Sequence, residues 1–266
     1  MASSRFNRLR SASAGSSEPL EPLPVRFMKY ADALKDAFVD EWELRMRMMK
    51  DISRVMGEEL ELTEENISLT IPLVAGLLVQ LKEHRSAVSA QASKTLAQVC
   101  LTMALVPRFQ LHIPRIVAAL SERLTVTVAV MCEAATKAIV EMITGMPIDT
   151  LPQLTCSILD AMGSHPSIRY KAAQFFRVLT GRVSELSPGN PSHGRVLPEV
   201  LPRLQEGIRL CIIEPSKAET REVGRHCFID FHFVAPERAA ELFASLSREN
   251  QLRIDELRHE PRAIPA

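Results

Sequence analysis

Two apolar helical stretches joined by a short polar break recur along this chain at intervals of roughly forty residues. The breaks lie near Glu41-Trp42, His84-Arg85, Thr125–Thr127, Ser164-His165 and Ser216-Lys217. A single helix pair cannot bury its apolar stripe alone, so neighbouring pairs must stack and share one core. The repeat therefore predicts an elongated body of stacked helix pairs.

Apolar periodicity and helix breakers divide the chain into six such pairs. They are predicted at 27–38 with 43–56, 66–82 with 87–105, 111–124 with 128–143, 150–162 with 167–182, 197–211 with 219–233, and 236–246 with 248–259. Repeats of this length are typical of HEAT-type solenoids. We therefore predict an all-α fold, an α-solenoid of six HEAT-like helix pairs, over residues 25–260. Prolines at 72, 114, 152, 198 and 202 are expected early in the first helices of the pairs, where the ring is tolerated.

The first 24 residues have a different composition, rich in Ser, Pro and Arg, and show no apolar period. Such a segment is predicted to be disordered. Arg5, Arg8 and Arg10, with no acid before Glu18, leave a mitochondrial transit peptide as the alternative. The apolar residues of this segment form no sustained stripe, which favours a solvated tail.

Charge and hydropathy limit the classes of partner. Lys+Arg and Asp+Glu both number 32, so the formal net charge is zero and no bulk field attracts nucleic acid or an acidic membrane. The longest apolar stretch, 67–81, is too short to span a bilayer and contains Pro72. We expect a cytoplasmic protein with neither nucleic acid nor membrane as a partner, and the oligomeric state stays open.

Enzyme signatures are absent from the sequence. It contains no glycine-rich phosphate loop, no GxSxG elbow and no HExxH motif. The five cysteines sit in apolar helical runs without a CxxC pair, and the seven histidines are scattered over different loops and helices. We therefore predict no catalysis, no metal site and no cofactor.

Several second helices begin with a basic residue near the break. Arg85, Arg169 and Arg221 each lie beside a break and off the apolar stripe that follows. Stacked repeats place equivalent positions in register, so these arginines are expected to be exposed along one edge.

Four segments resemble a known family. Asp40-Glu-Trp-Glu-Leu-Arg45 is similar to the D-W-E-x-R signature that opens TOG domains of the CLASP N-terminal family, and His84-Arg-Ser-Ala-Val88 is similar to that family's L-R-S-x-V loop. Residues 216–228 and 236–242 resemble its fifth-repeat helix and closing hairpin. The resemblance covers about residues 27–258 and includes the lone tryptophan.

TOG domains are flat HEAT paddles that grip αβ-tubulin through their intra-repeat loops. The resemblance implies a TOG-like domain in a microtubule-associated protein, one that binds αβ-tubulin or microtubules and influences microtubule dynamics or organisation. It implies a place at the cytoskeleton, with cilium and spindle as candidate sites. Trp42 would meet β-tubulin, and the basic residues of later loops would face α-tubulin. The tubulin-binding candidates carried over by position are Trp42, Arg45, Arg85, Ser86, Thr125, Val126, Thr127, His165, Arg169, Lys217 and Arg221.

The loops also depart from the family pattern. Thr125–Thr127 holds no basic residue, and His165 stands where a lysine is common. Acids among the bases would weaken attraction to acidic tubulin; they are Glu41, Glu43, Glu83 and Glu214. The alternative function is a general HEAT-repeat scaffold that binds another protein on its concave helical face. Under that alternative, Trp42 is a half-buried packing residue and the arginines make weak surface ion pairs.

Overall fold

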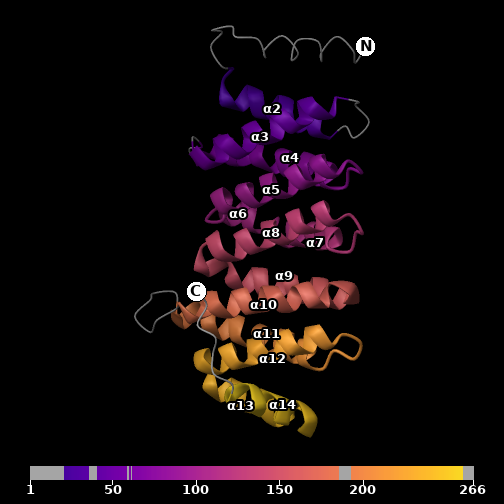
Figure 1. Ribbon diagram of the computed structural model, residues 1–266. Helices are drawn as coiled ribbons and strands as arrows, with labels where there is room; N and C mark the ends of the chain where they lie inside the picture. Colours follow the sequence, from indigo (N-terminus) through magenta and orange to yellow (C-terminus); the bar gives the residue numbers. More distant parts are fainter. Residues whose placement is uncertain (1–20, 36–40, 59, 61, 186–192, 260–266) are drawn as a thin grey trace.

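The computed structural model describes residues 21–35, 41–58, 60, 62–185 and 193–259, and these residues form helices and no β-strand. The helices stack in antiparallel pairs along one elongated axis (Figure 1). The pairs are α2 (Leu23–Leu34) with α3 (Trp42–Glu58), α4 (Glu64–Leu81) with α5 (Ser86–Met103), α7 (Ile113–Arg123) with α8 (Ala129–Gly145), α9 (Leu151–Ser164) with α10 (Arg169–Ser184), α11 (His193–Ile212) with α12 (Ala218–Val234), and α13 (Pro236–Ser245) with α14 (Arg248–His259). The predicted six-pair solenoid is confirmed.

Short elements complete the connections between and within the pairs. The four-residue helix α6 (Pro107–Gln110) precedes α7, and the 3-10 turns η2 (Ile148–Thr150) and η3 (Pro166–Ile168) precede α9 and α10. The first helices of the pairs pack against one another as one layer, and the second helices form the other. One continuous apolar core runs between the layers from Phe27 to Ile254.

Two glycines allow α11 to pack closely against α12 and α10. A Cβ on Gly224 of α12 would lie 2.8 Å from Cys211 Cβ and 2.9 Å from the backbone nitrogen of Ile212 in α11. A Cβ on Gly207 of α11 would lie 2.4 Å from the ring of Phe176 in α10. Because real side chains do not tolerate such distances, these glycines set the spacing between neighbouring helices.

The positions of three prolines differ from the prediction that all five lie early in their helices. Pro114 and Pro152 occupy the first turns of α7 and α9 as predicted, but Pro72 lies in the middle of α4, and Pro198 and Pro202 lie inside α11. These two helices begin earlier than expected. Thr63 caps α4, where its Oγ1 accepts from Asn66 N at 3.2 Å. An interior proline removes one helical hydrogen bond, and the surrounding packing must offset that loss.

Of residues 1–24, which are predicted to be disordered, residues 1–20 lie outside the described residues. The described chain begins at Glu21, and α2 begins at Leu23, so the end of that stretch is helical. No helix within the described ranges has both the length and the apolar character needed to cross a membrane.

Candidate functional site

The turns within the helix pairs lie along one edge of the solenoid, at the right in Figure 1. Contacts between neighbouring repeats connect them: Lys82 Nζ lies 3.5 Å from Glu122 Oε2, and Lys217 Nζ donates to the Ser167 carbonyl at 3.5 Å. We call this surface the intra-repeat edge, and it comprises residues 41–45, 82–86, 122–128, 164–169 and 213–221.

Trp42 is the first residue of α3 and is 38% exposed. Its neighbour Glu43 is exposed, whereas Leu44, Met48 and other members of the α3 stripe are buried. The indole therefore lies at the margin of the core and presents part of its surface at the edge. Its polar sequence context is the signal that distinguishes it from a core tryptophan.

Arg45 does not lie at the surface, although it was expected there as a loop contact. It is 2% exposed, and its Nη1 donates to Gln80 Oε1 at 2.6 Å and to Glu83 Oε2 at 2.9 Å. Gln80 Nε2 donates in turn to the Leu34 carbonyl at 2.6 Å. Arg45 thus joins α3 to the end of α4, and Gln80 extends the connection to the end of α2.

The sequence contains a local indication that Arg45 is buried, and our prediction did not use it. Arg45 precedes Met49 by four residues and Ile52 by seven, so it lies on the apolar stripe of α3. A buried guanidinium requires an acceptor. The acceptors come from the next repeat, and the local pattern does not identify them.

Glu83 is held as a carboxylate by this contact. Burial acts to raise its pKa, but the hydrogen bonds from Arg45 and from the backbone N–H of His84 outweigh burial and leave the pKa below its ordinary value. Glu83 was expected to weaken the attraction of the edge for an acidic partner. Its negative charge is instead offset by the buried Arg45.

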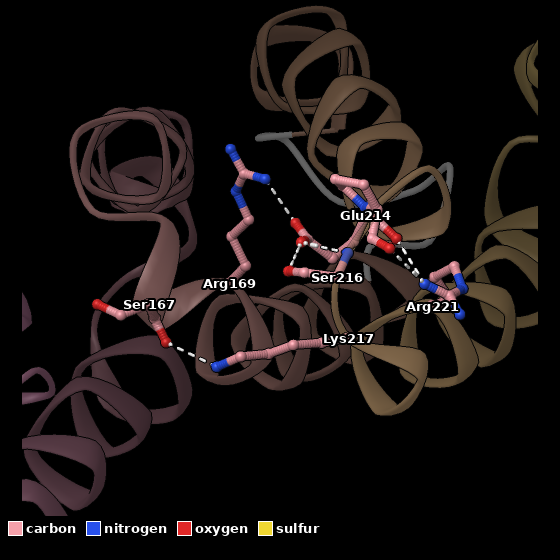
Figure 2. A network of polar contacts seen from close by, with 7 residues as sticks. Ser167, Arg169, Glu214, Ser216, Lys217 and Arg221 are labelled. Carbon is pink, nitrogen blue, oxygen red and sulfur yellow. Dashed lines mark hydrogen bonds and ion pairs between the residues drawn. The ribbon is translucent and has the colours of Figure 1, made fainter.

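A second network of this kind ties the fourth pair to the fifth. Figure 2 shows Arg169 Nη1 donating to Glu214 Oε2 at 2.5 Å, while Glu214 Oε1 accepts from the hydroxyl and the N–H of Ser216. Glu214 is 3% exposed. Burial again acts to raise its pKa, but Ser216 and Arg169 hold the pKa below its ordinary value. Arg221 Nη1 donates to the Glu214 carbonyl at 2.8 Å, so this guanidinium also orders the turn.

The two networks are built at equivalent positions. Glu83 and Glu214 each follow the last residue of a first helix by two positions, and each accepts from an arginine in the second helix of the preceding pair. Lys217 is exposed, whereas Arg169 and Arg221 are half-buried, so they differ from the expectation of fully exposed arginines. The stacking of the repeats places Arg169 and Arg221 on the edge, and each guanidinium donates a hydrogen bond to Glu214 in the turn.

The other nominated residues occupy the turns between these networks. Arg85, Thr125 and Thr127 are exposed; Ser86, Val126 and His165 are half-buried. Two exposed apolar residues of the edge that the sequence reasoning did not nominate join them, Val128 at 44% and Ile213 at 43%; Val130, 54% exposed, follows in the first turn of α8. The signal for the two valines is their position ahead of the buried stripe that starts at Met131.

The described residues include no group of three or more His, Cys, Asp or Glu that could hold a metal ion. Burial raises the pKa of the Cys211 thiol to about 12, and burial also raises the pKa of Cys100 and of Cys227. Such thiols are poor nucleophiles because the thiolate is the reactive form.

Known proteins and structures allow this geometry to be compared. No curated protein sequence matches the chain significantly. A structure from work on microtubule plus-end tracking by XMAP215, CLIP-170 and EB1 is 18% identical, with a TM-score of 0.61 over 86% of this chain and 88% of that one. A structure from work on the TOG domain array with which crescerin regulates microtubules in the primary cilium is 11% identical, with a TM-score of 0.61 over 87% and 90%.

The MAST/Orbit N-terminal domain is 12% identical, with a TM-score of 0.53 over 87% of this chain and 97% of that one. At these identities the three structures establish the fold. The sequence profile of the CLASP N-terminal family matches residues 39–255, which cover the solenoid from the first turn of the edge into its last helix. The chain therefore belongs to the CLASP N-terminal family.

Proposed function

We propose that this chain binds αβ-tubulin through the intra-repeat edge and thereby influences microtubule dynamics or organisation. Family membership supports the proposal, as do similar structures that come from work on microtubule tracking and on TOG domain arrays. On this proposal the protein acts as a non-enzymatic, microtubule-associated binding module located at the cytoskeleton.

The observation that carries the proposal is the distribution of side chains along the edge. A partly exposed tryptophan lies at the first repeat, and exposed or half-buried bases follow at the second, fourth and fifth. Aromatic anchors contribute strongly to protein interfaces because they bury a large area at little cost in conformational entropy. The buried Arg45 offsets the negative charge of Glu83 without using an exposed base, whereas Glu214 is offset by Arg169, which is itself a base of the edge.

The edge offers three kinds of contact on this proposal. Trp42 would meet β-tubulin, whereas the basic residues of the later turns would face α-tubulin; these are Arg85, with Ser86 beside it, His165, Arg169, Lys217 and Arg221. The middle of the edge, Thr125, Val126 and Thr127, would supply neutral contacts, to which the exposed Val128 adds apolar surface. Arg45 acts through Glu83 as a positioning residue for the second turn and makes no direct contact.

Co-sedimentation with microtubules, run beside gel filtration with free tubulin, tests the proposal. We expect the purified chain to bind at least one form, and Trp42→Ala to reduce that binding. Phe233→Ala is the matched control, because Phe233 is 68% exposed at the opposite end of its helix from the edge. If neither form of tubulin binds, the general HEAT-repeat scaffold becomes the better description.

A further inference from the structure

The connectors between the second and third helix pairs, and the one before α4, expose three large leucines. Leu62 is 48% exposed just before α4, Leu105 is 67% exposed just after α5, and Leu111 is 78% exposed between α6 and α7. These connectors join helix ends at the edge opposite the intra-repeat edge, where Figure 1 places α6. Exposed apolar residues that cluster are a feature of interaction surfaces.

Two contacts show that these segments are neighbours. Thr102 Oγ1, in the last turn of α5, donates to the Met56 carbonyl near the end of α3 at 2.7 Å. Arg108 Nη1, in α6, lies 3.8 Å from Glu64 Oε2 at the start of α4. We call this surface the leucine patch, and it comprises Leu62, Leu105 and Leu111 with the exposed acids Glu58, Glu64 and Glu65.

Most of the carboxylates around the leucine patch lack a strong ion pair within the described residues. Glu64 has the partner Arg108, but both side chains are largely exposed and such a pair is weak. Glu58 and Glu65 form no ion pair within the described ranges. Arg115 of α7 is the other exposed base close in sequence to Leu111. Apolar residues beside free carboxylates suit a segment that alternates basic and apolar side chains.

The chain itself contains such a segment outside the described residues. Residues 5–10 read Arg-Phe-Asn-Arg-Leu-Arg, and no acid occurs before Glu18. The spacing of Phe6 and Leu9 would let both apolar side chains reach one surface, while the arginines pair with carboxylates around it.

The geometry of α2 brings this segment within reach. Gln80 of α4 donates to the Leu34 carbonyl, and Gly76 lies against Leu34, so α2 and α4 run side by side in the same direction. Because the two helices are parallel, counting back eleven residues along each from this contact places the start of α2 level with the start of α4. Residues 11–22 can span up to about 40 Å when extended, whereas neighbouring helix axes are only about 8–10 Å apart.

We propose that residues 5–10 dock on the leucine patch of the same chain, with Phe6 and Leu9 covering the leucines and the three arginines facing Glu58, Glu64 and Glu65. This inference goes beyond the proposed function, because it concerns the opposite edge and requires no tubulin. The N-terminal segment is thereby held beside α4 and leaves the intra-repeat edge open.

Rapid-quench hydrogen exchange on the full chain at low salt tests the docking. We expect the amides of residues 5–10 to exchange at least about tenfold more slowly than in an unstructured chain. The protection should fall as salt is raised, because the arginine contacts are screened. Exchange at the unstructured rate in the wild-type protein overturns the proposal.

Variants at both partners establish the site. Leu105→Ser with Leu111→Ser should abolish the protection, and so should Arg5→Glu with Arg8→Glu and Arg10→Glu. Leu252→Ser is the matched control, because Leu252 is 47% exposed on α14 at the far end of the solenoid. Slow exchange of core amides shows that each variant is folded. Protection that survives both leucine substitutions contradicts the assigned patch.

Measuring the protection at several protein concentrations distinguishes docking within one chain from docking on a second copy. Docking within one chain gives the same protection at every concentration, with a monomer in sedimentation. Protection that rises with concentration alongside a dimer would place the segment of a second copy on the patch and overturn the intrachain proposal.

Discussion

Arg45 of α3 and Glu83 of the next repeat form an ion pair in which Arg45 is buried and Glu83 is half-buried, with Nη1 2.9 Å from Oε2. The pair has a counterpart between Arg169 and Glu214, again across neighbouring repeats. In both, the arginine comes from a second helix and the carboxylate from the following intra-repeat turn. The edge is therefore ordered by contacts between repeats as well as by the loops themselves.

Removing Arg45 should destabilise the fold strongly. Arg45→Ala leaves Glu83 and Gln80 without their shared donor. Breaking a fully buried pair from one side costs about 3–5 kcal/mol, and we expect a loss at the lower end of that range because Glu83 is half-buried. Glu83→Gln is a milder variant that keeps an acceptor for Arg45. Denaturant unfolding of both variants measures the difference, and a loss below about 1 kcal/mol in Arg45→Ala would show that water replaces the contact.

Acid should weaken the fold through the two turn carboxylates. Glu83 and Glu214 have pKa values below 4.5 in the folded chain, and their ordinary value applies when it unfolds. Their stabilising contribution is present above pH 4.5 and is lost as pH falls below that value through the lower folded pKa values. Urea unfolding between about pH 3 and 6 measures it. The double variant Glu83→Gln, Glu214→Gln should show a shallower decline, and an equally steep decline would assign the effect to other acids.

Trp42→Ala should affect binding more than stability. If the indole anchors tubulin, its removal costs roughly 2 kcal/mol or more of binding free energy. The unfolding free energy should fall far less than the roughly 3–5 kcal/mol expected for a fully buried tryptophan. Tubulin titration and denaturant unfolding on one preparation give both values. Unchanged binding with lost stability would make Trp42 a packing residue, and Phe233→Ala provides the comparison for an exposed aromatic away from the edge.

Charge reversal on the edge should weaken tubulin binding and reduce its dependence on salt. Lys217→Glu and Arg85→Glu change exposed residues, and such charges are screened over about 8 Å at physiological ionic strength. Arg221→Glu is a less clean change because Arg221 also bonds the Glu214 carbonyl. Arg47→Glu, on an exposed position further along α3, is the control for net charge. Equal losses in Arg47→Glu and Lys217→Glu would indicate a general charge effect rather than an edge.

Gly224→Ala should push α11 and α12 apart. Its new Cβ would lie 2.9 Å from the backbone nitrogen of Ile212, which cannot move aside as a side chain can. Overpacking of this kind costs about 1–3 kcal/mol. Gly181→Ala is the matched control, because nothing lies within 4 Å of its added Cβ and alanine favours helix by about 0.5–1 kcal/mol. The denaturant midpoints of the two variants measure the effect. Equal midpoints for Gly224→Ala and Gly181→Ala would show that α11 and α12 can separate without loss of stability.

The sequence predicted the six helix pairs because the apolar period and the breakers are local signals that act within each repeat. It placed the prolines of α4 and α11 too close to the helix starts. These helices begin at Glu64 and His193 rather than at 66 and 197, and Pro72 and Pro202 lie beyond the first turn even of the predicted ranges. For the candidate site, the sequence predicted where the turns lie but not how far their residues are buried, and the role of these residues in binding stays a prediction. Arg45 and Glu83 are 38 residues apart, and a pairing at that distance depends on how repeats stack. The partly exposed Trp42 followed from its polar neighbours, which is again a local signal.

The placement of the two arginine–glutamate pairs also means that the turns of the edge are held in different ways. One pair locks the first repeat to the second, and the other locks the fourth to the fifth. The third repeat meets the second at the edge through Lys82 and Glu122, which are 3.5 Å apart and largely exposed, and such contacts resist little. At the third repeat the position of the edge therefore depends on the packing of α5 against α8, whereas at the other two junctions it also depends on an arginine–glutamate pair.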